Sequence, residues 1–288
     1  MAERERTAVA PRREEIRSSV ENIESLATLS TITAALSEIL DDSESSAKDI
    51  ADLISRDHAL SANLLKLVNS PFYGFPGRIA SIRHAVILLG SNVVRAVSSN
   101  TVVHRVSGKA LKGLWTHSLG VALASRLVAA ELGVGEPEEL MIAGLLHDVG
   151  KAVLHTLLKE EAERVSQFAA QHNMFIFEAE RELFGVDHAE VGGWVAERWN
   201  FPVTLKEPIS YHHEPDSSKE TALRTAIVHF ANILVHGLDF GDDSENLVPP
   251  LDEMAWNRLG FLAEKLREIV NQVDGELSAT ETALFGST

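Results

Sequence analysis

The sequence predicts an all-α protein built as two packed helical lobes followed by a C-terminal helix. Apolar residues recur three and four positions apart in most long segments, and no persuasive alternating run or long internal repeat interrupts this pattern. Spacing of this kind places apolar side chains on one face of a helix, whereas strands alternate. Clusters of glycine, proline, asparagine and serine divide the segments into helices that must pack together to cover their apolar faces.

Composition limits the classes of function. The chain has 288 residues, 45% of them hydrophobic, which suffices for one large domain or two modest ones. Its formal charge of -16 repels polyphosphate backbones and argues against general nucleic-acid binding. The absence of cysteine excludes disulfides and thiolate metal sites and is typical of the cytoplasm. Since no uncharged apolar run reaches the roughly 18 residues of a spanning helix, we expect a cytoplasmic protein with no membrane contact.

The N-terminal lobe is expected over residues 21–108, preceded by a charged segment, 1–20, that forms a solvated tail or a frayed helix. "KDIADLISRD" has helical spacing, and "SIRHAVILLGSNVVRAV" reads as two short helices that meet at Gly90. Between them, "NSPFYGFPGR" cannot continue a helix. Its aromatic residues, Phe72, Tyr73 and Phe75, either cap the neighbouring helices or contact a partner, and we favour capping.

The second lobe is expected over residues 109–240. "LKGLWTHSLGVALASRLVAAELG" predicts a helix that Gly133 stops, and an amphipathic segment follows at 159–184. In "VDHAEVGGWVAERWNFP", Asp187 and Glu190 have the spacing of a capping box, so His188 should lie in the first turn of a helix. "TALRTAIVHFANILVHGL" predicts a further amphipathic helix.

Residues 241–288 are expected to form an acidic linker and a C-terminal helix. The segment "MAWNRLGFLAEKLREIVNQV" carries an apolar stripe of Leu259, Leu262, Leu266, Ile269 and Val270. This stripe either packs on the chain's own lobe or pairs with another chain, so a homodimer is possible, although packing within the chain is favoured.

The candidate functional residues lie in the second lobe, where side chains that can bind a metal ion recur between apolar residues on different helices. These are His117, His147, Asp148, His188, His212, His213, His229 and His236. A lone histidine is usually a hydrogen-bonded core residue, but several from different helices favour a common site. Imidazole binds borderline divalent metals well, and a carboxylate adds charge and can bridge two ions.

The pair His147 and Asp148 raises a geometric problem, because adjacent side chains on a helix diverge by about 100°. They suit one metal only where the backbone departs from helical geometry, or where the carboxylate bridges two ions. Lys151 follows three residues later and is placed to supply a cation for a substrate phosphate. Asp148 and Lys151 are therefore the candidate catalytic residues.

Four segments, "LWTHSLGVA", "GLLHDVGKAVL", "DHAEVGGWVAERWNFP" and "YHHEP", resemble the HD superfamily of metal-dependent phosphohydrolases. The stretch "LISRDHALSANLLKLVNSPFYGFPGRIASIRHAVILLGSNVVRAV" is similar to the signature of the HDOD domain, the HD-related output domain of bacterial signalling proteins. Together the matching segments run from about residue 24 to 214. The resemblance implies that an HDOD-type helical lobe is packed on an HD-type helical lobe.

The same resemblance implies a set of metal ligands. His117 resembles the first ligand of HD enzymes, His147 and Asp148 the pair that names the superfamily, and Lys151 the lysine of its HD-x-G-K motif. His188 and the pair His212 and His213 are similar to further histidines of the HD-GYP cyclic-dinucleotide phosphodiesterases. Which of the last two histidines binds metal remains open.

The departures from the family pattern matter equally. Asn232 stands where HD enzymes have their final aspartate, and "HHEPDSSKE" lacks the Gly-Tyr-Pro signature. An amide in place of a carboxylate removes a full negative charge, so the site should hold fewer ions. An imidazole-rich site with one carboxylate favours iron, zinc, nickel or manganese over magnesium.

Two functions follow from these patterns. The first is a regulatory signal-transduction module that binds a signalling protein partner or a second-messenger nucleotide, with a degenerate HD site that holds a divalent metal. The alternative is an active metal-dependent phosphohydrolase or phosphodiesterase acting on a nucleotide or cyclic dinucleotide. A third, purely structural interpretation makes the histidines hydrogen-bond partners between helices.

Overall fold

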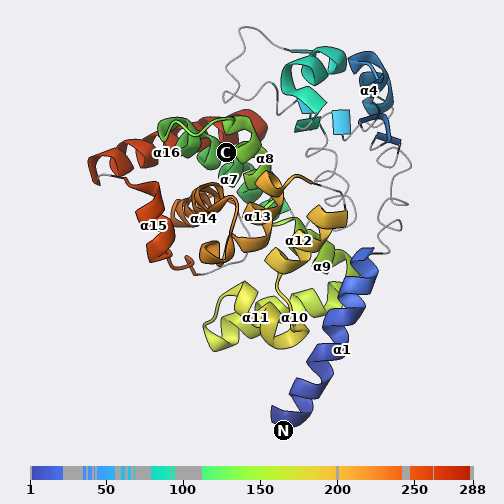
Figure 1. Cartoon of the computed structure of the whole chain (residues 1–288), viewed down its shortest axis with the longest axis vertical. Coiled ribbons are helices and arrows are strands. Elements are labelled where there is room, and N and C mark those ends of the chain that lie inside the picture. The colour runs from blue at the N-terminus through green and yellow to red at the C-terminus, as the bar shows by residue number, and fades with distance from the viewer. Residues whose placement is uncertain are drawn as a thin grey trace. The chain divides into compact units, whose positions relative to one another are not determined.

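In a computed structural model of the chain, the described residues are 2–21, parts of 35–94, and 112–285 apart from short gaps at 199–200, 242–246 and 262 (Figure 1). Every regular element in these described ranges is a helix, which confirms the all-α prediction. The chain divides into two compact units. One comprises residues 1–23 and 107–270, and the other comprises residues 24–106 and 271–288.

The unit of residues 24–106 contains helix α4, Ala47–Ile54. Ser46 caps it: the Asp49 amide donates to the Ser46 hydroxyl, and the Asp49 carboxylate accepts from the Ser46 amide at 3.0 Å. Ile50, Leu53 and Ile54 are buried on one face, as their spacing predicts. The loop with Phe72, Tyr73 and Phe75 lies outside the described residues.

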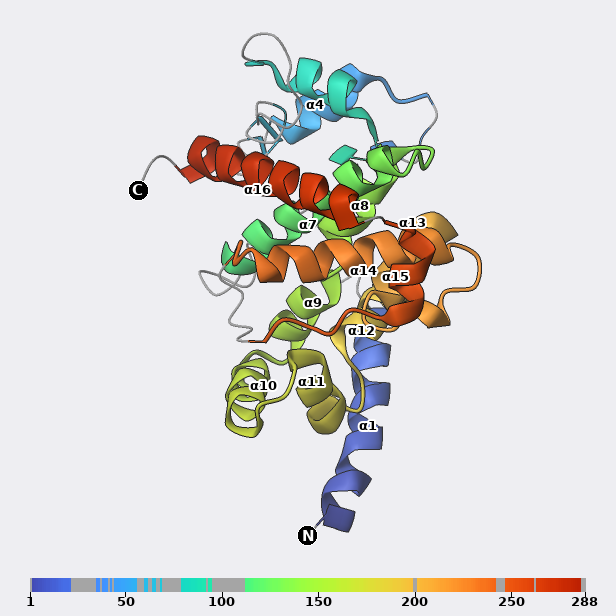
Figure 2. The same cartoon turned by 90° about the vertical axis from the view of Figure 1, so that its left-hand side faces the viewer.

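The larger unit contains the residues predicted to bind metal, and from α7 to α14 its helices follow one another in chain order (Figures 1 and 2). They are α1 Ala2–Glu21, α7 Lys112–Glu131, α8 Pro137–Leu146, α9 Val149–Leu157, α10 Lys159–His172, α11 Ile176–Phe184, α12 His188–Arg198, α13 Val203–Tyr211, α14 Ala222–Gly237 and α15 Glu253–Leu259.

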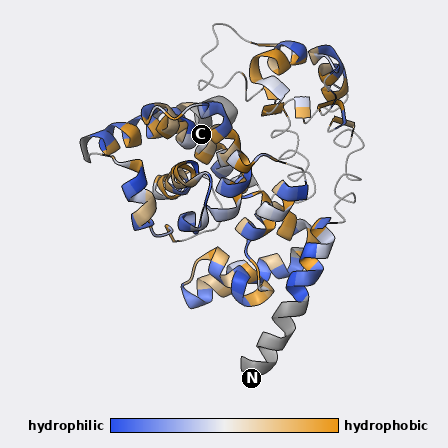
Figure 3. Cartoon of the chain, viewed as in Figure 1, coloured by the Kyte–Doolittle hydropathy of each residue, from blue (hydrophilic) through white to orange (hydrophobic). Residues whose placement is uncertain are grey.

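The core of this unit lies where α7, α8 and α14 pack together, with α13 against α8 and α14. Leu123, Leu140, Leu146 and Ile227 are fully buried there, and the apolar residues of these helices appear as orange bands in Figure 3. Helix α12 packs on α9 and α13. The five helices α7, α9, α12, α13 and α14, together with the α8–α9 junction, therefore present the candidate site residues to one interior region.

The charged N-terminal segment, expected to form a solvated tail or a frayed helix, forms helix α1. Its second half packs against α11 and α12, where Ile16 and Val20 are buried. Arg13 forms an ion pair with Glu190, and Arg12 pairs with Glu161 at 2.7 Å. Ile16 and Val20 are four positions apart and therefore lie on the same face of the helix, through which α1 packs. The many charges around them conceal this face in the sequence.

The C-terminal segment also differs, because the single predicted helix is two helices. Gly260, at φ +63°, ends α15 with a left-handed cap, and α16 covers Ala263–Phe285. Leu259 and Ile269 are buried, whereas Leu262 lies outside the described residues. Because Leu259 and Ile269 are buried within a single chain, the structure supports the interpretation that the apolar stripe packs against the chain's own helices.

One helical stretch, residues 137–157, is apolar and long enough to cross a membrane by length and composition. It consists of α8 and α9, separated by a turn, and 78% of its apolar window is buried inside the protein. A buried core helix can have the same length and apolar composition as a helix that spans a membrane.

Candidate metal centre

His147 and Asp148 stand at a break between two helices. Helix α8 ends at Leu146, α9 begins at Val149, and Asp148 has φ -96° and ψ 15°, outside the helical region. The backbone therefore makes the departure that two adjacent ligands require. It turns the Asp148 carboxylate toward His147, whose Nε2 lies 3.3 Å from Asp148 Oδ2.

Two further histidines from other helices converge on the same carboxylate. His188 Nε2 lies 3.1 Å and His212 Nε2 lies 3.6 Å from Asp148 Oδ1. His213 joins them through its Nε2, which is 2.8 Å from His188 Nε2. We call His147, Asp148, His188, His212 and His213 the His/Asp cluster. Its first four members are at most 2% exposed.

Hydrogen bonds at Nδ1 decide which nitrogen of each ring faces the carboxylate. His147 Nδ1 donates to the Gly144 carbonyl at 2.7 Å, and His212 Nδ1 donates to the Ile209 carbonyl at 2.9 Å. A carbonyl only accepts, so Nδ1 carries a proton in both rings, and each ring, when neutral, presents an Nε2 lone pair. Burial lowers the pKa of His212 to about 4, which keeps that ring neutral near pH 7.

Neutral rings thus direct Nε2 lone pairs toward the Asp148 carboxylate. Among the described residues, His147 Nε2 and His212 Nε2 are buried without a hydrogen-bond partner, and the Asp148 oxygens form ion pairs with Lys151 and His188. Burial works to raise the pKa of Asp148, but His147, Lys151 and His188 together hold that pKa well below its ordinary value, so the group is an anion. Lone pairs directed at a buried carboxylate are stabilised by a cation among them, and imidazole with carboxylate is a donor set suited to a transition metal. The residues therefore fit a divalent ion.

His188 has a different outer partner, a buried carboxylate. Its Nδ1 lies 2.6 Å from Glu180 Oε2, and its backbone amide donates to the same oxygen at 2.8 Å. Burial works to lower the pKa of His188, but Glu180 and Asp148 raise it to about 10. Near pH 7, without a metal, His188 is therefore a cation held between two carboxylates.

His117, the residue that resembles the first HD ligand, is brought to the edge of the cluster. Its Nε2 lies 4.0 Å from Asp148 Oδ2 but only 2.8 Å from the amide oxygen of Asn232. An amide oxygen accepts, so this nitrogen is engaged by Asn232. Asn232 thus occupies His117 Nε2 with an uncharged amide group.

Lys151 directs its charge at the cluster itself. Its Nζ lies 3.0 Å from Asp148 Oδ2, and its side chain is 11% exposed. One oxygen of Asp148 is therefore neutralised by Lys151, and the other faces His188 and His212. We expect this division to favour one ion over two.

His229 does not join the cluster. Its Nδ1 donates to the His212 carbonyl at 2.7 Å, and its Nε2 accepts from the Asp252 amide at 3.0 Å. Both ring nitrogens are thus used to connect α14, the end of α13 and the start of α15. This is the structural role that a core histidine usually has.

The predicted helix start at His188 is confirmed. Helix α12 begins at His188, and the Asp187 side chain accepts from the Glu190 amide at 2.8 Å. Glu180 was missed by the sequence reasoning. The signal was present, because Phe177, Glu180 and Phe184 share one face of α11, and a carboxylate on an apolar face requires a buried partner.

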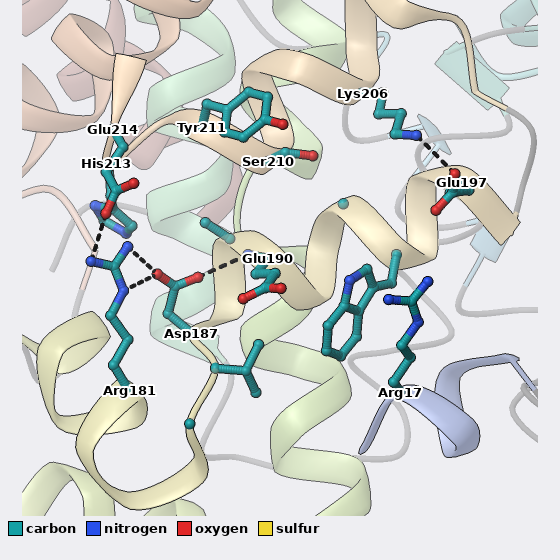
Figure 4. Close-up of a pocket in the computed structure, with 15 residues that line it drawn as sticks. Arg17, Arg181, Asp187, Glu190, Glu197, Lys206, Ser210, Tyr211, His213 and Glu214 are labelled. Carbon is teal, nitrogen blue, oxygen red and sulfur yellow. Dashed lines mark hydrogen bonds and ion pairs between the residues drawn. The ribbon is translucent and has the colours of Figure 1, made fainter. Parts of the chain in front are cut away.

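A pocket of about 640 Å³ lies beside the His/Asp cluster (Figure 4). Its charged lining includes Arg181, which pairs with Asp187 at 2.5 Å and with Glu214 at 2.7 Å. His213 is the member of the cluster that lines this pocket, and its ring stacks on Phe177. Within this unit, His213 therefore separates the buried cluster from the pocket.

Comparison with known proteins agrees with this fold. A solved HDOD domain protein with unknown function from Geobacter sulfurreducens is 26% identical, with a TM-score of 0.71 over 94% of this chain and 99% of that one. An uncharacterized protein of Treponema pallidum is 28% identical over 249 residues, 82% of this chain and 46% of the relative. Ribonuclease Y of Thermus thermophilus is 31% identical over 103 residues, 36% of this chain and 13% of that enzyme. The chain spans about half or less of the length of these curated relatives.

The helical fold and the buried His/Asp cluster define the class as an all-α domain with a candidate metal centre. The HDOD domain model matches residues 26–215, which is more than half of the chain. The chain belongs to the HDOD family.

Proposed function

We propose that this chain is a regulatory signal-transduction module whose His/Asp cluster holds one divalent transition-metal ion, and that it acts by binding rather than by turnover. The observation that carries the metal assignment is the convergence of His147, His188 and His212 on one buried carboxylate. The partner class we propose is a signalling protein or a second-messenger nucleotide. The donor set favours iron, zinc, nickel or manganese.

The residues that would hold the ion are Asp148, His147, His188 and His212, with His213 against His188. They come from the α8–α9 junction, the start of α12 and the end of α13. A bound divalent ion supplies strong ligand bonds that couple metal binding to folding. Asp148 would contribute the negative charge, and His147 and His212 would each contribute an Nε2 lone pair. Lys151 pairs with Asp148 and balances part of its charge.

Two observations favour binding over the alternative function, a phosphohydrolase. His117, His147, Asp148, His188 and His212 are at most 2% exposed, which leaves little access for a phosphoester. Lys151, the candidate phosphate-binding cation, is already paired with Asp148. We therefore expect no substantial turnover of nucleotides or cyclic dinucleotides.

The first test is elemental analysis of protein purified without chelator or affinity metal. We expect about one transition-metal ion per chain, and less than about a tenth of an ion in Asp148→Ala, because that variant lacks the only anionic ligand. Asp274→Ala, an exposed carboxylate on α16, is the matched control and should retain the ion. A metal-free wild-type protein, even after reconstitution, contradicts the proposal. Phosphodiesterase activity that Asp148→Ala abolishes would establish the alternative instead.

A second prediction concerns Asn232→Asp, which restores a carboxylate 2.8 Å from His117 Nε2 in place of the amide oxygen. We expect the variant to bind more metal, rising from about one ion toward two, because a second anion enters the site. In chelator its melting temperature should fall, since a second buried carboxylate then lacks a cation. Calorimetry and elemental analysis check both effects. An unchanged metal content would show that position 232 does not limit the number of ions.

A further inference from the structure

We propose that Glu180 and Arg181 of α11 form a positioning pair for the metal centre: Glu180 fixes the His188 ring from inside, and Arg181 ties together the two segments that carry His188 and His213. This inference rests on the proposed metal site. Neither residue resembles a metal ligand in the sequence, and neither lies within reach of Asp148 in the described contacts.

Glu180 acts on His188 through one oxygen. Its Oε2 lies 2.6 Å from His188 Nδ1 and accepts the His188 backbone amide at 2.8 Å, so ring and backbone are held at the same point. With Nδ1 engaged, only Nε2 is free to face Asp148 and His213. A carboxylate in this position fixes the ring orientation and increases the basicity of the ligand nitrogen.

His188 has a carboxylate as the partner of its Nδ1 atom, whereas His147 and His212 do not. His147 and His212 are anchored by backbone carbonyls three residues earlier in their own helices, so local geometry suffices to orient them. His188 is the first residue of α12 and has no preceding turn of its own helix to provide such a carbonyl. Glu180, 4% exposed, supplies the missing acceptor from α11.

Arg181 completes the pair on the outer side. Its guanidinium pairs with Asp187, the residue before His188, and with Glu214, the residue after His213 (Figure 4). One side chain thus joins the start of α12 to the segment that follows α13. Adjacent residues of α11 therefore hold both histidine-bearing segments, and His188 Nε2 and His213 Nε2 lie 2.8 Å apart between them.

The test is metal affinity and ligand geometry, measured with Co²⁺ on the full chain after removal of metal by chelator. We expect Glu180→Gln to weaken Co²⁺ binding about 10- to 100-fold and to shift the visible absorption bands of the bound ion. Arg181→Gln changes a side chain that is 42% exposed, so we expect it to fold, with a smaller, severalfold weakening. Glu182→Gln, exposed on the same helix, is the control and should match wild type.

The outcomes separate the two proposals. If wild-type protein does not bind Co²⁺, the proposed metal site fails. If wild-type protein binds Co²⁺ and both variants keep its affinity and spectrum, the positioning role is overturned while the metal site stands. Melting temperatures in chelator separate a loss of folding from a loss of affinity. If Glu180→Gln does not fold, Arg181→Gln alone provides the test. A wild-type Co²⁺ affinity and absorption spectrum in Arg181→Gln would then overturn the positioning role.

Discussion

Replacing Gly150 with alanine is expected to lower the free energy of unfolding by about 4 kcal/mol or more, at the upper end of single substitutions. Gly150 lies in α9 where that helix meets α12. A Cβ atom there would overlap the His188 carbonyl oxygen and lie 2.7 Å from the Gly192 amide nitrogen. Both are backbone atoms, so no side-chain rotation relieves the clash, and α9 must move away from α12.

The displacement also reaches the metal centre, because Gly150 lies two residues after Asp148 and its obstacle is His188 itself. Denaturant unfolding should therefore show a large fall in midpoint, and elemental analysis should show loss of metal. Gly275→Ala on α16 is the control: nothing lies within 4 Å of its Cβ, and the change should be neutral or slightly stabilising. A Gly150→Ala variant with wild-type stability and metal content would mean that α9 and α12 do not pack as described.

The second large effect is expected at Glu207. This buried carboxylate of α13 accepts hydrogen bonds from the Ser218 hydroxyl at 2.7 Å and the Thr221 amide at 2.7 Å, and further ones from the amides of Lys219 and Glu220. Burial works to raise the pKa of Glu207, but these donors lower it to about 2. The carboxylate thereby holds the segment that leads from α13 into α14.

A pKa depressed in the folded state stabilises the protein above the unfolded pKa, near 4.5, and that stability is lost as the pH falls toward 2. A shift of this size corresponds to about 3 kcal/mol, and we expect about 2 kcal/mol after screening by nearby solvent. Glu207→Gln should therefore be less stable than wild type by about 2 kcal/mol near pH 7. The difference should be roughly halved by about pH 3.

Urea unfolding of both proteins across this pH range provides the measurement. Glu220→Gln removes an exposed carboxylate from the same segment and serves as the control, with a change below about 0.5 kcal/mol. A constant stability difference between wild type and Glu207→Gln at all pH values would exclude the ionised carboxylate as the source of the effect.

Much of the fold could be predicted because its determinants are local. The apolar spacing of α4, the left-handed stop at Gly133 and the capping of α12 by Asp187 each depend on residues within a few positions of one another. Two features were not predicted. The charges of the N-terminal segment hid the packing of α1 through its buried residues Ile16 and Val20, and Gly260 divides the expected C-terminal helix into α15 and α16.

The candidate site could be predicted as a list of residues but not as an arrangement. His147, Asp148, His188, His212 and His213 were all identified from the sequence, and the structure brings them together. His117 was expected to act as a ligand and stays a prediction: its ligand atoms lie close to those of His147 and Asp148, and its Nε2 also contacts Asn232. His229 was grouped with the metal-seeking residues, yet both of its ring nitrogens connect backbone segments.

The sequence by itself determined that this chain is helical, that it carries an HD-type set of histidines with one aspartate, and that Asn232 removes a charge. Only the tertiary structure decided which nitrogen of each histidine faces Asp148, that Lys151 pairs with one of its oxygens, and that Glu180 contacts the His188 ring while Arg181 pairs with Glu214, the residue after His213. The physical reason is that ring orientation and charge pairing depend on contacts between helices far apart in the chain, such as His117 with Asn232, 115 residues apart. Periodicity and capping report only on a residue's own helix.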